Sequence, residues 1–203
     1  MTAKIKLNAA SGGGSFSLQA PSSSANTRVM TLPDTADGTI LTTTNPKAGN
    51  VIQVQQTVGT GTYSTNSQTY SDVITCAITP SSTSNKIICI YKIGCSTSSQ
   101  GYSGAVRLAR DSTAIYVGAA ASNRIQASSH FVADSDAIGH VKIFDQSGSF
   151  LDSPSTTSAI TYRLQFRTDY SGTYIYAGQS LEDSDATYRG RVPTSLLLME
   201  VAA

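Results

Sequence analysis

Apolar and polar residues alternate along most of this chain, and nowhere do apolar residues recur at i, i+3, i+4 and i+7 for three helical turns. The segment TYRLQFRTDY at 161–170 is the clearest case. In an extended chain, Tyr162, Leu164 and Phe166 point to one side, and the arginines and the glutamine between them point to the other. Such a strand has one buried and one solvated face, so the pattern predicts an all-β protein.

The segment NKIICIYKIGC at 85–95 differs, because apolar residues occupy both sides of the extended chain. A strand of this kind is typical of the middle of a sheet. We therefore predict a central strand that is covered on both faces. One face carries Ile87, Cys89, Tyr91 and Ile93, and the other carries Ile88 and Ile90.

Other segments complete the pattern. SGAVRLARDSTAIYV predicts a hairpin that turns around Asp111 and Ser112. The closing SLLLMEV predicts a strand with Leu197, Met199 and Val201 on one face. Roughly eight to ten strands fit between residue 50 and the C-terminus, which is the strand density of a β-sandwich. The fold class we predict is an antiparallel β-sandwich, jelly-roll-like, preceded by an extended N-terminal β-arm.

The boundary between arm and head is predicted near Pro46, within TTTNPKAGN at 42–50. The pairs Asn-Pro and Gly-Asn interrupt regular structure there, and no earlier piece exceeds about five residues of strand-like sequence. The arm is thus predicted to be residues 1–45 and the head residues 46–203. Within the arm, SGGGS at 11–15 predicts a flexible joint.

The arm contains three short pieces with apolar residues, FSLQAP, RVMTLP and GTIL, and no helix to cover them. Short strands leave backbone N–H and C=O groups open along their edges, and so few strands are at best marginally stable alone. We expect sister copies, or a sheet edge of a partner, to complete the arm. The predicted assembly residues are Phe16, Leu18, Pro21, Val29, Leu32, Pro33, Ile40 and Leu41.

Charge and hydropathy exclude several classes of protein. Only 13% of the residues are charged, the net charge is +1, and the basic residues are scattered, so nucleic acid is not an expected partner. The N-terminal sequence lacks the apolar run of a signal peptide, and no stretch approaches the ~18 apolar residues that span a bilayer. We expect a protein made in a cytoplasm, without general secretory export and without membrane insertion.

The three cysteines, Cys76, Cys89 and Cys95, are an odd number and cannot all pair within one chain. Cys89 and Cys95 lie in one predicted strand, about 20 Å apart at ~3.3 Å per residue. This separation is too large for a disulfide. Buried free thiols are the expected state, and a bond from Cys76 to either of the others across a sheet stays open.

Candidate residues for hydrolysis are few. The chain has two histidines, His130 and His140, and the nearest resemblance to a GxSxG motif, GYSG at 101–104, lacks the spacing. Acidic pairs could serve a glycosidase only if they faced each other across a cleft, and pairs adjacent in a polar loop are typical of solvated turns. These pairs are Asp134 with Asp136, Glu182 with Asp183, and Asp183 with Asp185.

One segment, DSDAIGHVKIFD at 134–145, partly matches an EF-hand loop. It has Asp134, Asp136, Gly139 and Asp145 at the first, third, sixth and twelfth places. The fifth place is Ile138, which has no oxygen ligand, and HVKIF favours a strand. We therefore predict no catalytic residue, no metal site, no cofactor and no enzymatic activity. The alternative of a different class is a small glycan-degrading head.

Tyrosine is frequent, with ten residues, three of which lie in DYSGTYIYAG at 169–178. The centre, YSGT, predicts a turn between strands, which places some of the rings at a loop tip. A tyrosine ring offers a flat apolar face and one hydroxyl, which suits contact with sugars or proteins, although aromatic residues are also common in strands. The candidate contacts to a host-cell glycan or protein are Tyr170, Tyr174 and Tyr176.

The arm sequence SFSLQAP…RVMTLPDTADGTIL resembles the N-terminal segments of bacteriophage tail-fibre and related virion-appendage proteins. The segments ITPSSTSNKIICI, FLDSPSTTSAITYRLQF and TSLLLMEV are similar to trimeric jelly-roll heads of phage fibres. The resemblance implies a homotrimer, attachment to other virion proteins through the arm, and a head for host contact or surface decoration. The function it predicts is that of a structural virion protein, a tail-fibre or short-fibre component for host adsorption. A capsid-decorating head fibre is the alternative.

Overall fold

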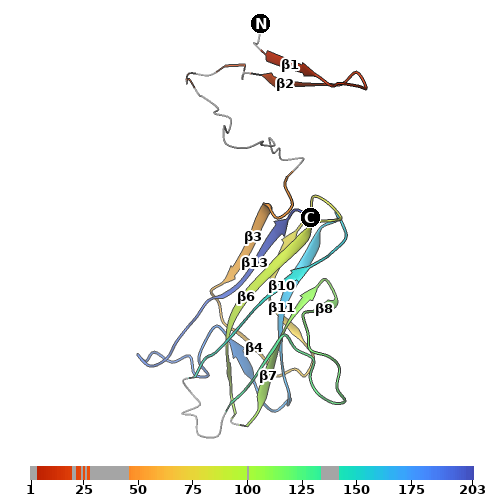
Figure 1. Ribbon diagram of the computed structural model, residues 1–203. Helices are drawn as coiled ribbons and strands as arrows, with labels where there is room; N and C mark the ends of the chain where they lie inside the picture. Colours follow the sequence, from red (N-terminus) through yellow and green to blue (C-terminus); the bar gives the residue numbers. More distant parts are fainter. Residues whose placement is uncertain are drawn as a thin grey trace, which may run out of the picture. The chain divides into compact units, whose positions relative to one another are not determined.

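The computed structural model describes residues 4–19, 22, 23, 25, 27, 46–99, 101–133 and 142–203 (Figure 1). All regular secondary structure in these residues is β-strand, so the predicted all-β class is confirmed. The chain divides into two compact units, residues 1–40 and 41–203. The boundary between arm and head near Pro46 stays a prediction.

In the N-terminal unit, β1 (Lys4–Asn8) and β2 (Ser15–Gln19) form an antiparallel hairpin. The glycine run forms its turn, and Gly12 and Gly13 have φ angles of 83° and 69°. Glycine adopts this left-handed region without steric cost, which explains why the turn consists of glycines. The prediction of a flexible joint at residues 11–15 is therefore wrong, because the segment connects two paired strands.

Two antiparallel sheets build the head, and both are visible in Figure 1. Sheet I has the order β3-β13-β6-β12-β4, and β10 pairs with the edge of β6 opposite β13. Its strands are β3 (Val51–Gly59), β4 (Tyr63–Thr65), β6 (Lys86–Thr97), β10 (Phe144–Asp152), β12 (Ile175–Ala177) and β13 (Thr194–Val201). Sheet II has the order β5-β11-β7-β8, and β9 also pairs with β7. Its strands are β5 (Ser71–Ile78), β7 (Ser103–Arg110), β8 (Thr113–Ile115), β9 (Ser129–Val132) and β11 (Ile160–Thr168).

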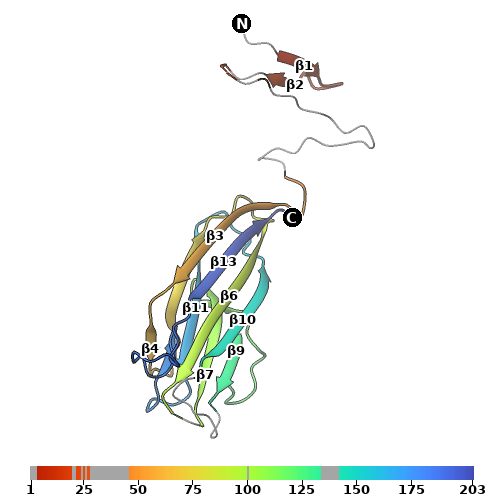
Figure 2. The ribbon, with the colours of Figure 1, turned by 90° about the vertical axis from the view of Figure 1, so that its left-hand side faces the viewer.

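The two sheets pack face to face, as the predicted sandwich requires, and Figure 2 shows β3, β13, β6 and β10 side by side with β11 behind them. The core lies between the sheets. On β11, Tyr162, Leu164 and Phe166 are buried in it, while the residues between them are half-buried on the outer face, so the predicted alternation is confirmed. The described part of the head has eleven strands, one more than the upper limit of the prediction.

Two local predictions are also confirmed. The chain turns at Asp111 and Ser112 between β7 and β8, and Asp111 has a φ of 51°, a conformation that aspartate tolerates better than most residues. On β13, Leu197, Met199 and Val201 share one face, and the other face contributes Leu196 and Leu198 to the core.

The prediction for β6 is only half correct. The strand is central, since β13 and β10 pair with its two edges, and its side from Ile87 to Ile93 is fully buried. The opposite side is not covered by the described residues, since Ile88 is only half-buried and Ile90 is 40% exposed. The outer side of β6, with Ile88 and Ile90, is therefore apolar although it points away from the core.

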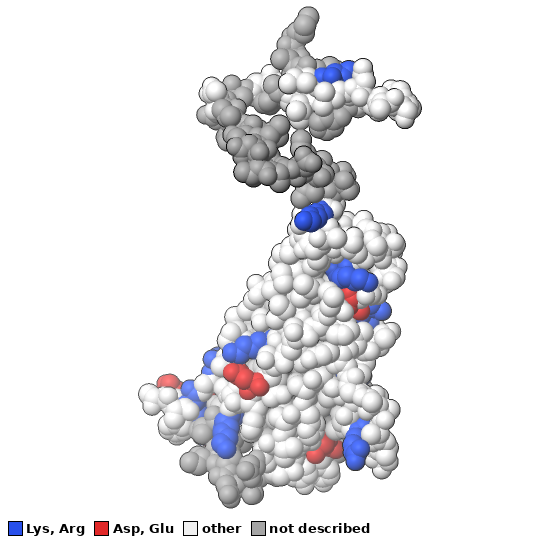
Figure 3. Space-filling view, viewed as in Figure 1, with Lys and Arg blue, Asp and Glu red and all other residues white. Residues whose placement is uncertain are grey.

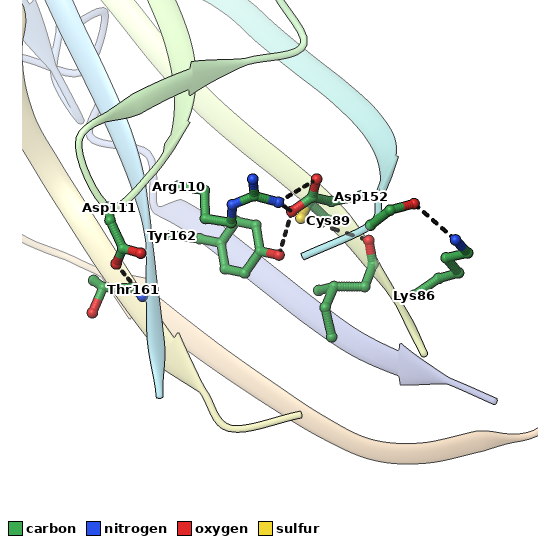
Figure 4. A network of polar contacts seen from close by, with 9 residues as sticks. Lys86, Cys89, Arg110, Asp111, Asp152, Thr161 and Tyr162 are labelled. Atoms are coloured by element: carbon green, nitrogen blue, oxygen red, sulfur yellow. Dashed lines mark hydrogen bonds and ion pairs between the residues drawn. The ribbon is translucent and has the colours of Figure 1, made fainter. Parts of the chain in front are cut away.

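A buried polar cluster joins the two sheets (Figure 4). Asp152, at the end of β10 in sheet I, accepts hydrogen bonds from the Arg110 Nη1 at 2.9 and 2.7 Å and from the Tyr162 hydroxyl at 2.7 Å. Arg110 and Tyr162 belong to sheet II. Burial, followed by the hydrogen bond to Asp152, raises the pKa of Tyr162 above its ordinary value. The cluster gives one carboxylate three polar contacts in an otherwise apolar core.

All three cysteines are free and buried, as expected. The pKa values of Cys89 and Cys95 are raised chiefly by burial, which disfavours the thiolate. Because the thiolate is the nucleophilic and metal-binding form, these residues act as small core side chains.

Candidate functional site

The loops at one end of the head are tied together by backbone hydrogen bonds. The Ser98 N–H donates to the Tyr174 carbonyl oxygen at 2.8 Å, and the Asp169 N–H donates to the Ser103 carbonyl oxygen at 3.1 Å. The first bond joins the loop after β6 to the residue before β12, and the second joins the loop after β11 to the first residue of β7. We call this end, which carries Tyr102, Tyr170, Tyr174 and Tyr176, the tyrosine end.

The chain enters the head at the opposite end of the sandwich. The Gly49 N–H donates to the Ala202 carbonyl oxygen, and the Ala202 N–H donates to the Asn50 carbonyl oxygen, both at 2.9 Å. These residues lie beside the first residue of β3 and the last of β13, and Val201 pairs with Lys86, the first residue of β6. The tyrosine end follows the last residue of β6, so the two regions are separated by the length of that strand.

Tyr170 lies at the turn between β11 and β12, and half of its surface is exposed. Its ring stacks on the Tyr102 ring, with the centroids 5.0 Å apart and the planes 13° from parallel. The Thr173 N–H donates to the Tyr170 carbonyl oxygen at 3.0 Å and closes the turn. A side chain at Gly172 would collide with the ring, since a Cβ there would lie 2.4 Å from a ring carbon of Tyr170. The turn is thus built to hold one exposed ring.

Tyr174 and Tyr176 form a second pair, with ring centroids 6.3 Å apart and planes at 25°. The Tyr174 N–H donates to the Ser98 Oγ at 2.8 Å, so its backbone is fixed to the neighbouring loop while its ring stays exposed. The predicted turn in YSGT is confirmed, and two of the three candidate rings lie next to each other. Exposed, pre-positioned tyrosines offer rigid apolar contact area at a low cost in conformational entropy.

Sequence reasoning missed Tyr102 and a third aromatic group at Tyr70. The Arg107 guanidinium lies 4.0 Å and the Arg167 guanidinium 5.8 Å from the Tyr70 ring centroid. Burial raises the pKa of Tyr70, although both arginines oppose this. Alternation did place Arg167 on the outer face of its strand, but Tyr70 and Arg107 meet it only through strand pairing, which the sequence does not reveal.

No protein-family model matches the chain, and no curated protein matches its sequence. Solved structures from infectious bursal disease virus are similar to it at a low level. The structure of the Gx strain has a TM-score of 0.40 and 12% identity, over 94% of this chain and 43% of that one. The T=1 particles derived from the virus have a TM-score of 0.39 and 11% identity, over 92% and 45%. The VP2 subviral particle has a TM-score of 0.38 and 11% identity, over 92% and 46%.

The chain therefore spans less than half the length of these viral proteins. Similarity at this level does not assign a function to the chain.

The candidate carboxylates for hydrolysis are held by arginines. Asp183 accepts a hydrogen bond from the Arg191 Nε at 2.7 Å, and Glu182 is bound by Arg189. The bond from Arg191 lowers the pKa of Asp183, whereas a general acid needs a raised pKa. Both aspartates of this loop line a pocket of about 320 Å³ formed by residues 183–186 and 189–191. Its lowered pKa makes Asp183 a poor general acid.

The remaining candidates for chemistry are mostly outside the described residues. That group contains His140 and three residues of the EF-hand-like segment, Asp134, Asp136 and Gly139. Asp145 is the second residue of β10, and its Oδ2 lies 3.5 Å from the Lys92 Nζ. His130 is exposed on β9. In the described ranges, no group of three or more His, Cys, Asp or Glu residues could hold a metal ion.

Charged side chains lie in small separate groups on the face of the head shown in Figure 3. In the described part of the chain, no helix is long and apolar enough to cross a membrane.

Of the predicted assembly residues of the arm, Phe16 and Leu18 belong to β2. The others, Pro21, Val29, Leu32, Pro33, Ile40 and Leu41, lie outside the described residues. The partner strand β1 was not predicted, although the alternation in KIKLN was a signal for it. Ile5 pairs with Leu18 across the hairpin, and Ile5, Leu7 and Leu18 are all exposed.

Proposed function

We propose that the chain is a structural protein of a bacteriophage virion, a homotrimeric tail-fibre or short-fibre component. Its arm anchors it to other virion proteins, and its head presents the tyrosine end to a host-surface glycan or protein. Display of three heads multiplies weak contacts through avidity. The proposal combines the resemblance of the arm sequence to virion-appendage proteins with one structural observation, the uncovered hairpin of the arm.

That observation carries the proposal. The hairpin β1–β2 turns Ile5, Leu7 and Leu18 toward one exposed face. A two-stranded hairpin is marginally stable at best in water. An exposed apolar face on such a hairpin is typical of a site that binds another protein. Sister hairpins or a sheet of another virion protein would bury this face.

We expect the double substitution Ile5→Lys and Leu7→Lys to lower the number of copies of this chain per virus particle by about tenfold or more, because two buried apolar side chains would be replaced by charges. The measurement is quantitative immunoblotting of purified particles from a virus that carries the variant gene. Lys6→Ser is the matched control, since Lys6 lies on the opposite side of the same strand and pairs with Ser17. Incorporation of the double variant at the wild-type level would show that the arm is not the anchor. Imaging of labelled wild-type particles would separate the tail from the capsid as the location.

For the head, we expect Tyr170→Ala to reduce binding of the purified chain to host cells by about tenfold or more, because the exposed anchor of the stacked pair is lost. Tyr188→Ala is the control, because Tyr188 is also exposed but packs against Arg189 in another loop. Equal binding by both variants and the wild type would show that the tyrosine end is not the host-binding surface. This result would not contradict the proposed attachment of the arm to the virion.

A further inference from the structure

The outer face of sheet I carries an apolar row that crosses four neighbouring strands. The strand register places Val54 opposite Met199, Met199 opposite Ile88, and Ile88 opposite Leu151. The next row adds Leu197 opposite Ile90. We call these six residues the apolar face. Val54 and Leu151, at its two sides, are 51% and 57% exposed.

The outer face of sheet II has the opposite character. Arg163 forms an ion pair with Asp72, and Gln165 connects Asp72 to Arg107 by hydrogen bonds of 2.6 and 2.7 Å. An antiparallel sheet with one solvated face normally looks like this, with polar residues outside. The two outer faces of one sandwich therefore differ, and only that of sheet I breaks the alternation.

An apolar surface of this size has a physical cost in water. The face spans four strands, each about 4.8 Å from the next, and Val54, Ile90 and Leu151 on it are 40–57% exposed. Contiguous exposed apolar side chains mark interaction sites on soluble proteins. The apolar face is also where the sequence predicted a covered strand, since Ile88 and Ile90 lie on it. Among the described residues of the head, 46–99, 101–133 and 142–203, no element covers it.

We propose that the apolar face packs against a second copy of this chain and forms the contact between subunits of the head. The inference rests on the homotrimer of the proposed function and names its interface.

The chemistry of the face favours an identical partner. None of its six residues is charged, and the positions that extend its rows are Gln56 and Ser149, both uncharged. The nearest charges toward the tyrosine end, on Lys92 and Asp145, form an ion pair, and the nearest charge at the other end, on Lys86, donates a hydrogen bond to the Ser153 Oγ at 2.9 Å. A surface without net charge offers nothing to a strongly charged partner, whereas interfaces between identical subunits are more apolar than other interfaces.

The position of the chain termini supports the same partner. The chain enters the head at Asn50, beside Ala202, at one end of the strands that carry the apolar face. If three copies were related by rotation about an axis parallel to these strands, the Asn50 residues of all three copies would lie at the same end of the trimer. The N-terminal segments of sister copies would then start close together, as an arm completed by sister strands requires.

The test uses the full-length chain and sedimentation velocity over a range of concentrations. We expect the wild type to be a trimer, and Val54→Glu to weaken association by at least about 30-fold, the size of a hot-spot substitution. Val132→Glu is the matched control, because Val132 is also 51% exposed on an edge strand but belongs to β9 in sheet II. Leu151→Glu, on β10, repeats the test if Val54→Glu does not fold, which circular dichroism would show.

The outcomes are distinct. A trimer that persists in both Val54→Glu and Leu151→Glu would overturn the inference and leave the homotrimer intact. Equal dissociation in Val132→Glu would also overturn it, because the effect would not be specific to this face. A monomeric wild type would overturn both the interface and the homotrimer, and would leave the face to the N-terminal segment of the same chain or to another protein.

Discussion

Replacement of Asp152 by alanine is expected to lower the free energy of unfolding by about 1–3 kcal/mol, the cost of leaving a buried hydrogen-bonding group without its partner. The Asp152 side chain is nearly buried, whereas Arg110 retains partial access to solvent. The loss therefore falls mainly on the Tyr162 hydroxyl, which would remain in the core without its acceptor at 2.7 Å. Denaturant unfolding monitored by circular dichroism measures the change.

Asp72→Ala is the control for this prediction. Asp72 also pairs with an arginine, but this ion pair lies on the outer face of sheet II and about a third of each side chain is exposed. Such surface pairs contribute about 0–1 kcal/mol. If the two variants lost similar stability, the cluster at Asp152 would not be the main polar connection between the sheets. Asp152→Asn should lie between them, since its amide oxygen can still accept the Tyr162 hydrogen bond while the charge is lost.

The parts of the fold that follow from local sequence were predictable. Alternation located β11 with its buried face and β13 with the residues that share its outer face, and the turn chemistry of Asp111 located the β7–β8 hairpin. These signals depend only on residues close in the sequence. The glycine run was misread because a joint and a hairpin turn have the same composition, and only the pairing of KIKLN with SFSLQ distinguishes them.

The parts that depend on contacts between distant residues were not predictable. Asp152 and Arg110 are 42 residues apart, and nothing near either of them marks a buried pair. The stacking of Tyr102 on Tyr170 likewise arises because the ends of β7 and β11 lie side by side. For β6, the sequence indicated correctly that both faces are apolar. It could not indicate that one of these faces stays partly exposed in the part of the chain that the structure describes.

The stability contributed by Glu200 is expected to depend strongly on pH. This residue of β13 is fully buried, and its carboxylate accepts hydrogen bonds from Gln53, from the N–H and hydroxyl of Ser81, and from Asn85, at 2.6–2.7 Å. Burial raises the pKa of Glu200, but the hydrogen bonds from Asn85, Gln53 and Ser81 outweigh it and hold the pKa below its ordinary value. The carboxylate thus joins β3, β13 and the loop before β6.

A folded-state pKa below the unfolded value means that the stabilisation is fully present above the unfolded pKa, about 4.3 for glutamate, and is lost as the pH falls through the folded pKa. At neutral pH, Glu200→Gln should cost about 2–3 kcal/mol, because the new amide group turns a donor toward other donors and the charged acceptor is gone. The difference from the wild type should shrink steadily below about pH 4.3. Denaturant unfolding at several pH values measures it.

Asp145→Asn provides the comparison for Glu200, because Asp145 is largely exposed and its ion pair with Lys92, at 3.5 Å, lies at the surface. Its replacement should change the stability by less than about 1 kcal/mol at every pH. A Glu200→Gln difference that stayed constant from neutral to acidic pH would contradict the prediction, since it would mean that packing alone sets its cost. A difference that grows in acid would contradict it more strongly, because the protonated form of Glu200 would then contribute more to stability than its carboxylate.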